Sequence, residues 1–246
     1  MTVLTSPEAD NPTRWRLRTR VPDDWIDLAG TSTTAAALGV IRGSFAVAGV
    51  DLTPQDAELL RAGLDAWRDL AGRHQILIHG LVHQGAEFAG ETALGREIFW
   101  DVTGTVTELS AVDGPVSLLE VVRRVVAARL GFDVNEAYTE AFRTGIGPAL
   151  GVTTELDMPY RVPGEPEDAA PRTRTVGLAV VVTAPKQGGP ALVLSGWSLD
   201  PAQRNGLGML LAAMAGPATI VAEGADEAPS APAPAAPGTP SSPADA

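Results

Sequence analysis

Three consecutive segments decide the fold of this chain: Val176-Gly-Leu-Ala-Val-Val-Val-Thr183, Pro185-Lys-Gln-Gly-Gly-Pro190 and Ala191-Leu-Val-Leu-Ser-Gly-Trp-Ser198. The first is short, apolar and rich in β-branched residues, which predicts a strand buried on one or both faces. The second predicts a tight turn, because its Gly pair tolerates positive φ and each Pro removes a backbone donor. The third returns as a second strand, so the region is expected to form a hairpin.

A helix is predicted directly after this hairpin. The carboxylate of Asp200 can accept from the unpaired amides of a first helical turn, and Pro201 occupies the first helical position at no cost. An apolar stripe at helical spacing follows, made of Leu207, Leu210, Leu211 and Met214. Gly216 and Pro217 then end the helix. The uncharged run 205–222 is about long enough to span a membrane, but its glycines and its lack of cationic anchors favour a core helix followed by an extended segment.

Earlier parts of the chain predict more strands and two capped helices. Strands are expected at 14–21, 75–83, 95–108 and 148–160, and helices are expected to start at Thr53 and Ser117. Residues 31–49 fit either a helix or a strand. Because several strands follow one another without an intervening helix, we expect an α+β fold, a single largely antiparallel sheet with helices packed on it.

The chain is predicted to contain one folded domain between two unstructured ends. Residues 1–12 are expected to form a flexible leader, and 13–221 to form a single α+β domain. Residues 222–246 contain nine Ala and six Pro, with four acidic residues and no basic one. That composition predicts a disordered acidic tail.

Composition and charge exclude several classes of function. There is no Cys, so disulfides, thiolate metal sites and cysteine nucleophiles are absent. The net charge of −12 argues against binding to a nucleic-acid backbone. The first residues have neither a cationic nor an apolar signal region, which predicts a cytoplasmic protein without membrane contact. Almost all basic residues are Arg, a bias typical of GC-rich bacterial genomes. The oligomeric state is left open.

Four arginines alternate along the first predicted strand and form the candidate binding site: Arg14, Arg16, Arg18 and Arg20. Guanidinium groups on one strand face repel one another unless anions oppose them. In the structural interpretation, Glu97 and Asp101 on a neighbouring strand form the opposing acidic ladder. In the functional interpretation, the arginines form a docking strip for an acidic partner segment, such as a tail like that of this chain.

The histidines suggest a weaker second site. His79 and His83 lie four residues apart, with Glu87 four further on, which on a helix would give a metal-binding face. The local pattern favours a strand instead, where the two rings would lie about 13 Å apart. We therefore predict no metal and no cofactor.

The overall pattern resembles the fold shared by photosystem PsbP and the Ran-binding Mog protein. The resemblance is carried by Val21-Pro-Asp-Asp-Trp25 after the first strand, by Trp197-Ser-Leu-Asp-Pro201, and by a last helix near Pro217. Actinobacterial lipoproteins of the LpqN type and small proteins linked to type VII secretion are similar. Because such proteins are mostly binding or assembly factors, the resemblance implies a PsbP/Mog-like α/β/α sandwich and a non-enzymatic adaptor with a protein partner, in a secretion system. The alternative is a small-molecule-binding or hydrolytic domain with a pocket between sheet and helices and His79 or His83 as the base.

Overall fold

The predicted hairpin lies in the middle of the main sheet. It consists of β8 (Arg172–Thr183) and β9 (Gly188–Ser198). At the turn, Gly188 and Gly189 have φ values of 91° and 115°. Side chains disfavour such positive φ values, which explains why the turn contains a Gly pair.

The structure, a computed structural model, describes residues 2–4, 14–47, 49, 51–74, 76–84, 98–111, 117–130, 137–160, 168 and 170–223. The other strands are β1 (Thr2–Leu4), β2 (Trp15–Arg18), β3 (Trp25–Asp27), β4 (Ile76–Gln84), β5 (Ile98–Ala111), β6 (Tyr138–Arg143), β7 (Pro148–Tyr160) and β10 (Thr219–Ala222). The helices are α1 (Thr34–Val47), α2 (Pro54–His74), α4 (Leu118–Leu130) and α5 (Arg204–Ala215), with the short 3-10 helix η2 at Pro201–Gln203.

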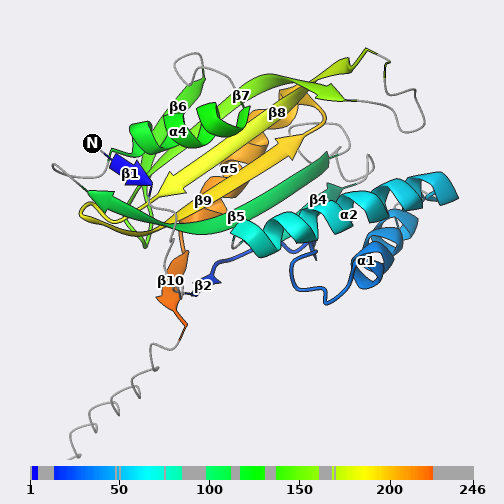
Figure 1. The fold of residues 1–246 in the computed structure, drawn as a ribbon, viewed down its shortest axis with the longest axis horizontal. Helices are drawn as coiled ribbons and strands as arrows, with labels where there is room; N and C mark the ends of the chain where they lie inside the picture. Colours follow the sequence, from blue (N-terminus) through cyan, green and yellow to red (C-terminus); the bar gives the residue numbers. More distant parts are fainter. Residues whose placement is uncertain are drawn as a thin grey trace, which may run out of the picture.

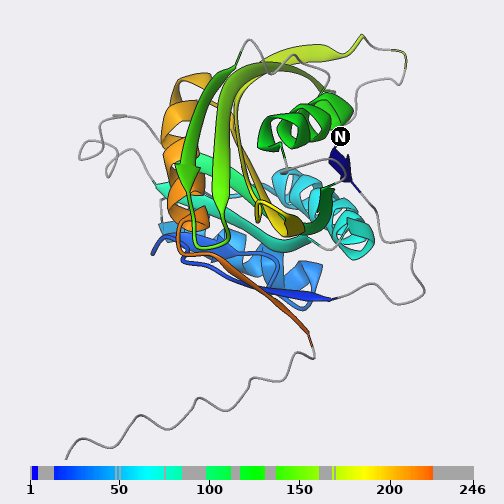
Figure 2. The same ribbon diagram turned by 90° about the vertical axis from the view of Figure 1, so that its left-hand side faces the viewer.

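The strands form an antiparallel sheet with helices on both of its faces. Within the described residues its order is β3-β4-β5-β9-β8-β7-β6, and β1 pairs with the far end of β5. Every pair is antiparallel. Figure 2 shows α5 on one side of this sheet and α2 and α4 on the other. The α+β class and the largely antiparallel sheet are thus confirmed.

Two apolar layers sandwich the central strands. On β8, Ala179 and Val181 belong to the core under α5, whereas Val180 and Val182 belong to the core under α4. The continuous apolar run of β8 is therefore explained by burial on both faces. A third cluster joins α1 and α2 to β3 and β4.

Glycines let α5 lie close to the sheet. A Cβ at Gly196 of β9 would come within 2.8 Å of Leu207, and one at Gly208 of α5 would come within 2.6 Å of Thr153. The hydrogen bonds of η2 fix the start of α5. Asp200 accepts from the amide of Ala202, as predicted for a cap.

Several elements differ from the sequence predictions or were left open by them. The ambiguous segment 31–49 is mostly the helix α1, and β6 was not predicted. Thr2–Leu4, within the predicted leader, pairs with β5 as β1. The predicted disordered tail lies outside the described residues from 224 onward. None of the described helices has the length and apolar character needed to cross a membrane.

Candidate functional site

Arg16 and Arg18 lie in β2, one strand of a two-stranded ribbon apart from the main sheet, and Arg14 and Arg20 flank that strand. β2 pairs with β10, so that Arg18 lies opposite Thr219 and Arg16 opposite Val221. Figure 1 shows both strands at the lower side of the molecule, below β5. The alternation predicted for this segment is confirmed, because Arg14, Arg16, Arg18 and Arg20 are exposed while the residues between them are half-buried. We call these four side chains the arginine strip.

The ribbon is held against the end of α5. Leu17 and Ile220, one from each strand, pack against the core cluster that contains Leu211 and Met214. The hydroxyl of Thr19 also donates to the carbonyl oxygen of Met214. The apolar side of the ribbon therefore faces the domain, and the strip faces solvent.

The proposed acidic ladder does not oppose the strip. The neighbour of β2 is β10, not β5, and Asp101 of β5 instead contacts His79. Glu97 lies outside the described residues. The structural interpretation of the strip is therefore wrong in its choice of neighbour, because the last strand, β10, pairs with β2.

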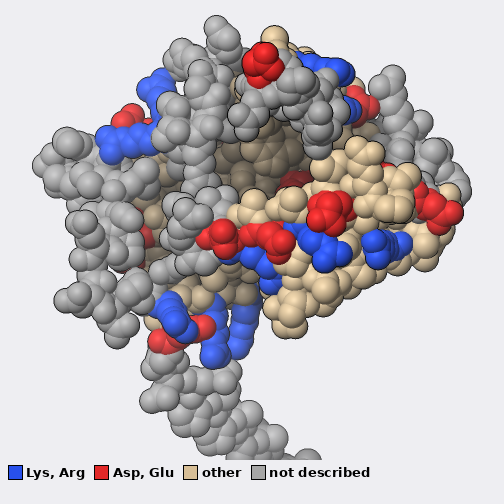
Figure 3. All heavy atoms as spheres, turned by 45° about the vertical axis from the view of Figure 1, so that its right-hand side comes forward, with Lys and Arg blue, Asp and Glu red and all other residues tan. Residues whose placement is uncertain are grey.

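Within the described part of the chain, most of the positive charge of the strip has no acidic partner. Arg16 forms an ion pair with Glu223, with 3.7 Å between Nε and Oε1, and its side chain is 72% exposed. No described acidic side chain pairs with Arg14, Arg18 or Arg20. Figure 3 shows Lys and Arg side chains gathered at the lower edge of that view, over the ribbon. The strip thus presents several guanidinium groups to solvent.

The two histidines lie on strand β4, as predicted, and pack against helices. The His79 ring stacks on Trp67 of α2 at 4.1 Å between centroids, and the His83 ring stacks on Phe45 of α1 at 4.9 Å. Glu87 lies outside the described residues. Among the residues that are described, no three metal-ligating side chains come together.

His79 belongs to a polar row on the sheet face that carries α2. Its Nε2 lies 3.3 Å from Oδ2 of Asp101, and its Nδ1 is buried without a hydrogen-bond partner. Its cross-strand neighbour Thr103 shares a hydrogen bond of 2.8 Å with Ser195. The hydrolytic interpretation needs a hydroxyl at an imidazole nitrogen. The structure supplies the Asp–His contact but places no described hydroxyl there.

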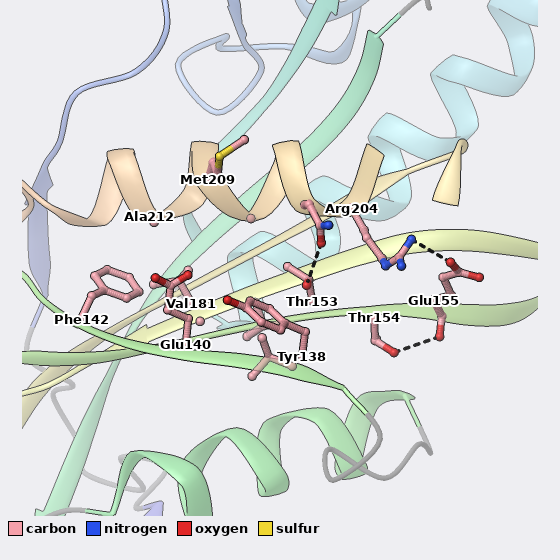
Figure 4. Close-up of a pocket in the computed structure, with 15 residues that line it drawn as sticks. Tyr138, Glu140, Phe142, Thr153, Thr154, Glu155, Val181, Arg204, Met209 and Ala212 are labelled. Atoms are coloured by element: carbon pink, nitrogen blue, oxygen red, sulfur yellow. Dashed lines mark hydrogen bonds and ion pairs between the residues drawn. The ribbon is translucent and has the colours of Figure 1, made fainter. Parts of the chain in front are cut away.

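A groove runs between α5 and the edge of the sheet formed by β6 and β7. Its volume is about 1070 Å³. Figure 4 shows α5 as one wall and the strands as the floor. The lining residues are Tyr138, Glu140, Phe142, Gly151, Val152, Thr153, Thr154, Glu155, Val180, Val181, Arg204, Asn205, Gly208, Met209 and Ala212.

The groove exists because one helix covers only part of the sheet. α5 packs mainly on β8 and β9. A helix is about 10 Å across and strands are about 4.8 Å apart, so one helix covers roughly two strands. The same face of β6 and β7 is left open beside α5.

Paired polar groups close one end of the groove. Arg204 forms an ion pair with Glu155 at 2.7 Å, and the hydroxyl of Thr153 donates to Asn205 at 3.3 Å. At the other end the lining is apolar or aromatic, apart from the carboxylate of Glu140. A pocket between sheet and helices was one of the sequence-based alternatives, but it was expected to use His79 or His83, and neither histidine lines this groove. The residues of β6 were missed because that strand was not predicted.

The comparisons with known proteins found a solved structure of low similarity. No protein-family model and no curated protein sequence matches the chain. A solved structure titled "Crystal structure of LpqN involved in cell envelope biogenesis of Mycobacterium tuberculosis" is 14% identical, with a TM-score of 0.38. The match covers 90% of this chain and 91% of LpqN. Since the similarity is this low, the functional argument rests on the geometry described above.

Proposed function

We propose that this chain is a non-enzymatic binding protein, an adaptor that takes an extended acidic segment of a protein partner on the arginine strip. The observation that carries the proposal is a row of four exposed guanidinium groups of which only Arg16 has a described acidic partner. Unpaired cations on a protein whose net charge is −12 attract a local anion and not a large anionic surface.

The spacing of the strip favours an extended peptide. Alternate residues of a strand lie about 6.8 Å apart, and a partner strand with an acidic residue at every second position has the same repeat. Each carboxylate then meets one guanidinium. Exposed pairs of this kind contribute about 0.2–1 kcal/mol each, so four pairs give weak to moderate affinity.

Glu223 supports this arrangement from within the chain. Its amide donates to the carbonyl oxygen of Arg14 at 2.7 Å, while its carboxylate pairs with Arg16. An acidic residue directly after β10 therefore already occupies one position beside the strip. A partner segment would extend the same contact to Arg18 and Arg20.

Fluorescence anisotropy with labelled peptides tests the proposal on the full chain. The probe is a twelve-residue peptide that alternates Glu and Thr, compared with a peptide of six Glu followed by six Thr and with a Gln/Thr peptide. We expect the alternating peptide to bind most tightly, with a strong loss of affinity as salt rises. Equal binding of the alternating and block peptides would contradict the register argument.

A matched pair of variants separates the strip from net charge. We replace all four strip arginines by Gln: Arg14, Arg16, Arg18 and Arg20. This variant is expected to bind the alternating peptide at least about tenfold more weakly. The control replaces four arginines outside the strip, namely Arg42, Arg61, Arg143 and Arg174, and changes the net charge equally. If both variants lose the same affinity, or if vesicles of phosphatidylglycerol bind and the peptide does not, the proposal fails.

The cellular setting is a separate part of the proposal. The resemblance named above implies a bacterial secretion system, and we propose that the protein acts in the cytoplasm. Recovery of the tagged protein from its host, followed by fractionation and identification of co-purified chains, tests both statements.

A further inference from the structure

We propose that the groove between α5 and β6 is a binding site for a small organic cation, an ammonium or guanidinium group carried on an apolar body. This site is separate from the arginine strip and carries the opposite charge. The inference is independent of the proposed protein partner, since it rests on other residues and another ligand chemistry.

The charge of the groove comes from one unpaired carboxylate. Glu155 is neutralised by Arg204 at 2.7 Å. Glu140, on β6, has no ion pair or hydrogen bond among the contacts described for its side chain. A lining with a single free carboxylate matches a ligand with a single positive charge. If a basic peptide or a polyamine bound here, most of its positive charges would have no carboxylate to pair with.

Two aromatic rings flank that carboxylate. Tyr138 and Phe142 lie two residues before and after Glu140, so all three side chains project from the same face of β6. Figure 4 shows the Glu140 carboxylate between the two rings. The face of an aromatic ring attracts a cation, and the attraction adds to that of the carboxylate.

The groove also offers exposed apolar side chains that the apolar body of the ligand can contact. Met209 of α5 is 71% exposed and Tyr138 is 65% exposed, although both line the groove. Methionine is flexible and polarizable, which suits contact with apolar groups of varied shape. Gly151 and Ala212 keep the space between floor and wall free of larger side chains.

Regular strand structure supports part of the groove. Phe142 packs against the core cluster under α5, and Gly151, which pairs with Glu140 across the strands, lies within β7. The groove volume of about 1070 Å³ is slightly above the usual range of about 300–1,000 Å³ for small-molecule sites, so a small ligand fits in it. A pre-formed site loses little conformational entropy on binding.

NMR titration of the isotope-labelled full chain tests the inference. The probe is 2-phenylethylammonium ion, and the matched neutral probe is 2-phenylethanol. We expect the ammonium to bind with a Kd on the order of 1 mM, with shifts confined to the groove, and the alcohol to bind several-fold more weakly. Equal binding of both probes would show that the carboxylate plays no part and would overturn the site.

Charge-matched variants locate the cation. Glu140→Gln is expected to weaken ammonium binding about fivefold, whereas Glu108→Gln, an exposed residue of β5 outside the groove, is expected to change nothing. Phe142→Leu keeps apolar contact but removes the ring, and should weaken binding about twofold to fivefold. Unchanged binding in Glu140→Gln, with folding verified by its NMR spectrum, would refute the inference.

Two further ligands distinguish the proposed class from its alternatives. Spermidine is expected to bind no more than about twofold more tightly than the monoamine, since one carboxylate is free. A tenfold preference for spermidine, or binding of a Lys/Gly peptide without binding of the ammonium ion, would replace the small-molecule site by a polycation surface. The variant lacking all four strip arginines should bind the ammonium ion as well as the natural chain does.

Discussion

The arginine strip and the groove beside α5 are two kinds of surface on one domain. The strip is a two-residue repeat in and beside one strand, β2, and the partner strand β10 only holds it in place. The groove needs the three consecutive strands β6, β7 and β8 together with α5, which follows β6 by about 60 residues. The strip should therefore tolerate substitution without loss of stability, whereas the structure around the groove should not.

The largest expected difference is between a buried leucine of the groove wall and a half-buried leucine of the ribbon. Leu211 of α5 is fully buried, so Leu211→Ala should lower the free energy of unfolding by about 2–5 kcal/mol. Leu17→Ala should cost about 1 kcal/mol, because Leu17 is only partly buried. Urea unfolding of both variants measures the difference. Equal losses would mean that the ribbon is as integral to the core as α5 is.

The second largest change in stability is expected at the buried side-chain amide of Gln203, which lies just before α5. Gln203 accepts from the indole N–H of Trp100 at 2.9 Å and from the hydroxyl of Ser198 at 3.0 Å. Gln203→Met leaves two buried donors unsatisfied, and each costs about 1–3 kcal/mol. Thr103→Val, which removes a half-buried hydroxyl bonded to Ser195, is the control and should cost less. Thermal unfolding of both variants measures these losses. A larger loss of stability in Thr103→Val would contradict the role given to the Gln203 amide.

Replacing a helical glycine by alanine should change the free energy of unfolding in opposite directions at two positions. A Cβ at Gly208 would lie 2.6 Å from Thr153, so Gly208→Ala should destabilise the fold by about 1 kcal/mol even after the gain in helix propensity. Gly63 of α2 has open space around it, and Gly63→Ala should stabilise the fold by about 0.5–1 kcal/mol. Chemical denaturation of the pair tests whether close packing on the sheet is specific to α5.

The smallest change in stability is expected in the strip itself. Arg18 has no described ionic partner, so Arg18→Gln should alter the free energy of unfolding by less than about 0.5 kcal/mol. Arg16→Gln removes the pair with Glu223 and should cost at most about 1 kcal/mol. Both variants should nevertheless bind the alternating acidic peptide more weakly than the natural chain does. A stability loss above 2 kcal/mol in Arg18→Gln would show that the strip has a structural role.

Local patterns were sufficient to predict many single elements. The predicted capping box at Thr53 is present, since its hydroxyl accepts from the amide of Asp56 and the Asp56 carboxylate accepts in return from Thr53. The turn with its Gly pair and the cap at Asp200 are present as well. In each case the interacting groups lie within a few residues of one another, so sequence spacing alone places them.

Elements that depend on distant partners were not predicted. β6 is short and exposed at the sheet edge, so it carries no apolar alternation by which it could be found. The pairing of β2 with β10 joins the beginning of the domain to its end. No pattern in the sequence of either strand predicts which strand it pairs with. The choice of Asp101 as an opposing charge was wrong for this reason.

The sequence by itself determined the composition limits, the antiparallel α+β class, the hairpin and the alternating arginines. These follow from short-range periodicity and from the conformational preferences of single residues. Tertiary structure alone decided that three of those arginines have no acidic partner within the described part of the chain, and that Tyr138, Glu140 and Phe142 face α5 across an open groove. Strand order and helix placement depend on which apolar faces bury each other, and that is a property of the whole packed chain.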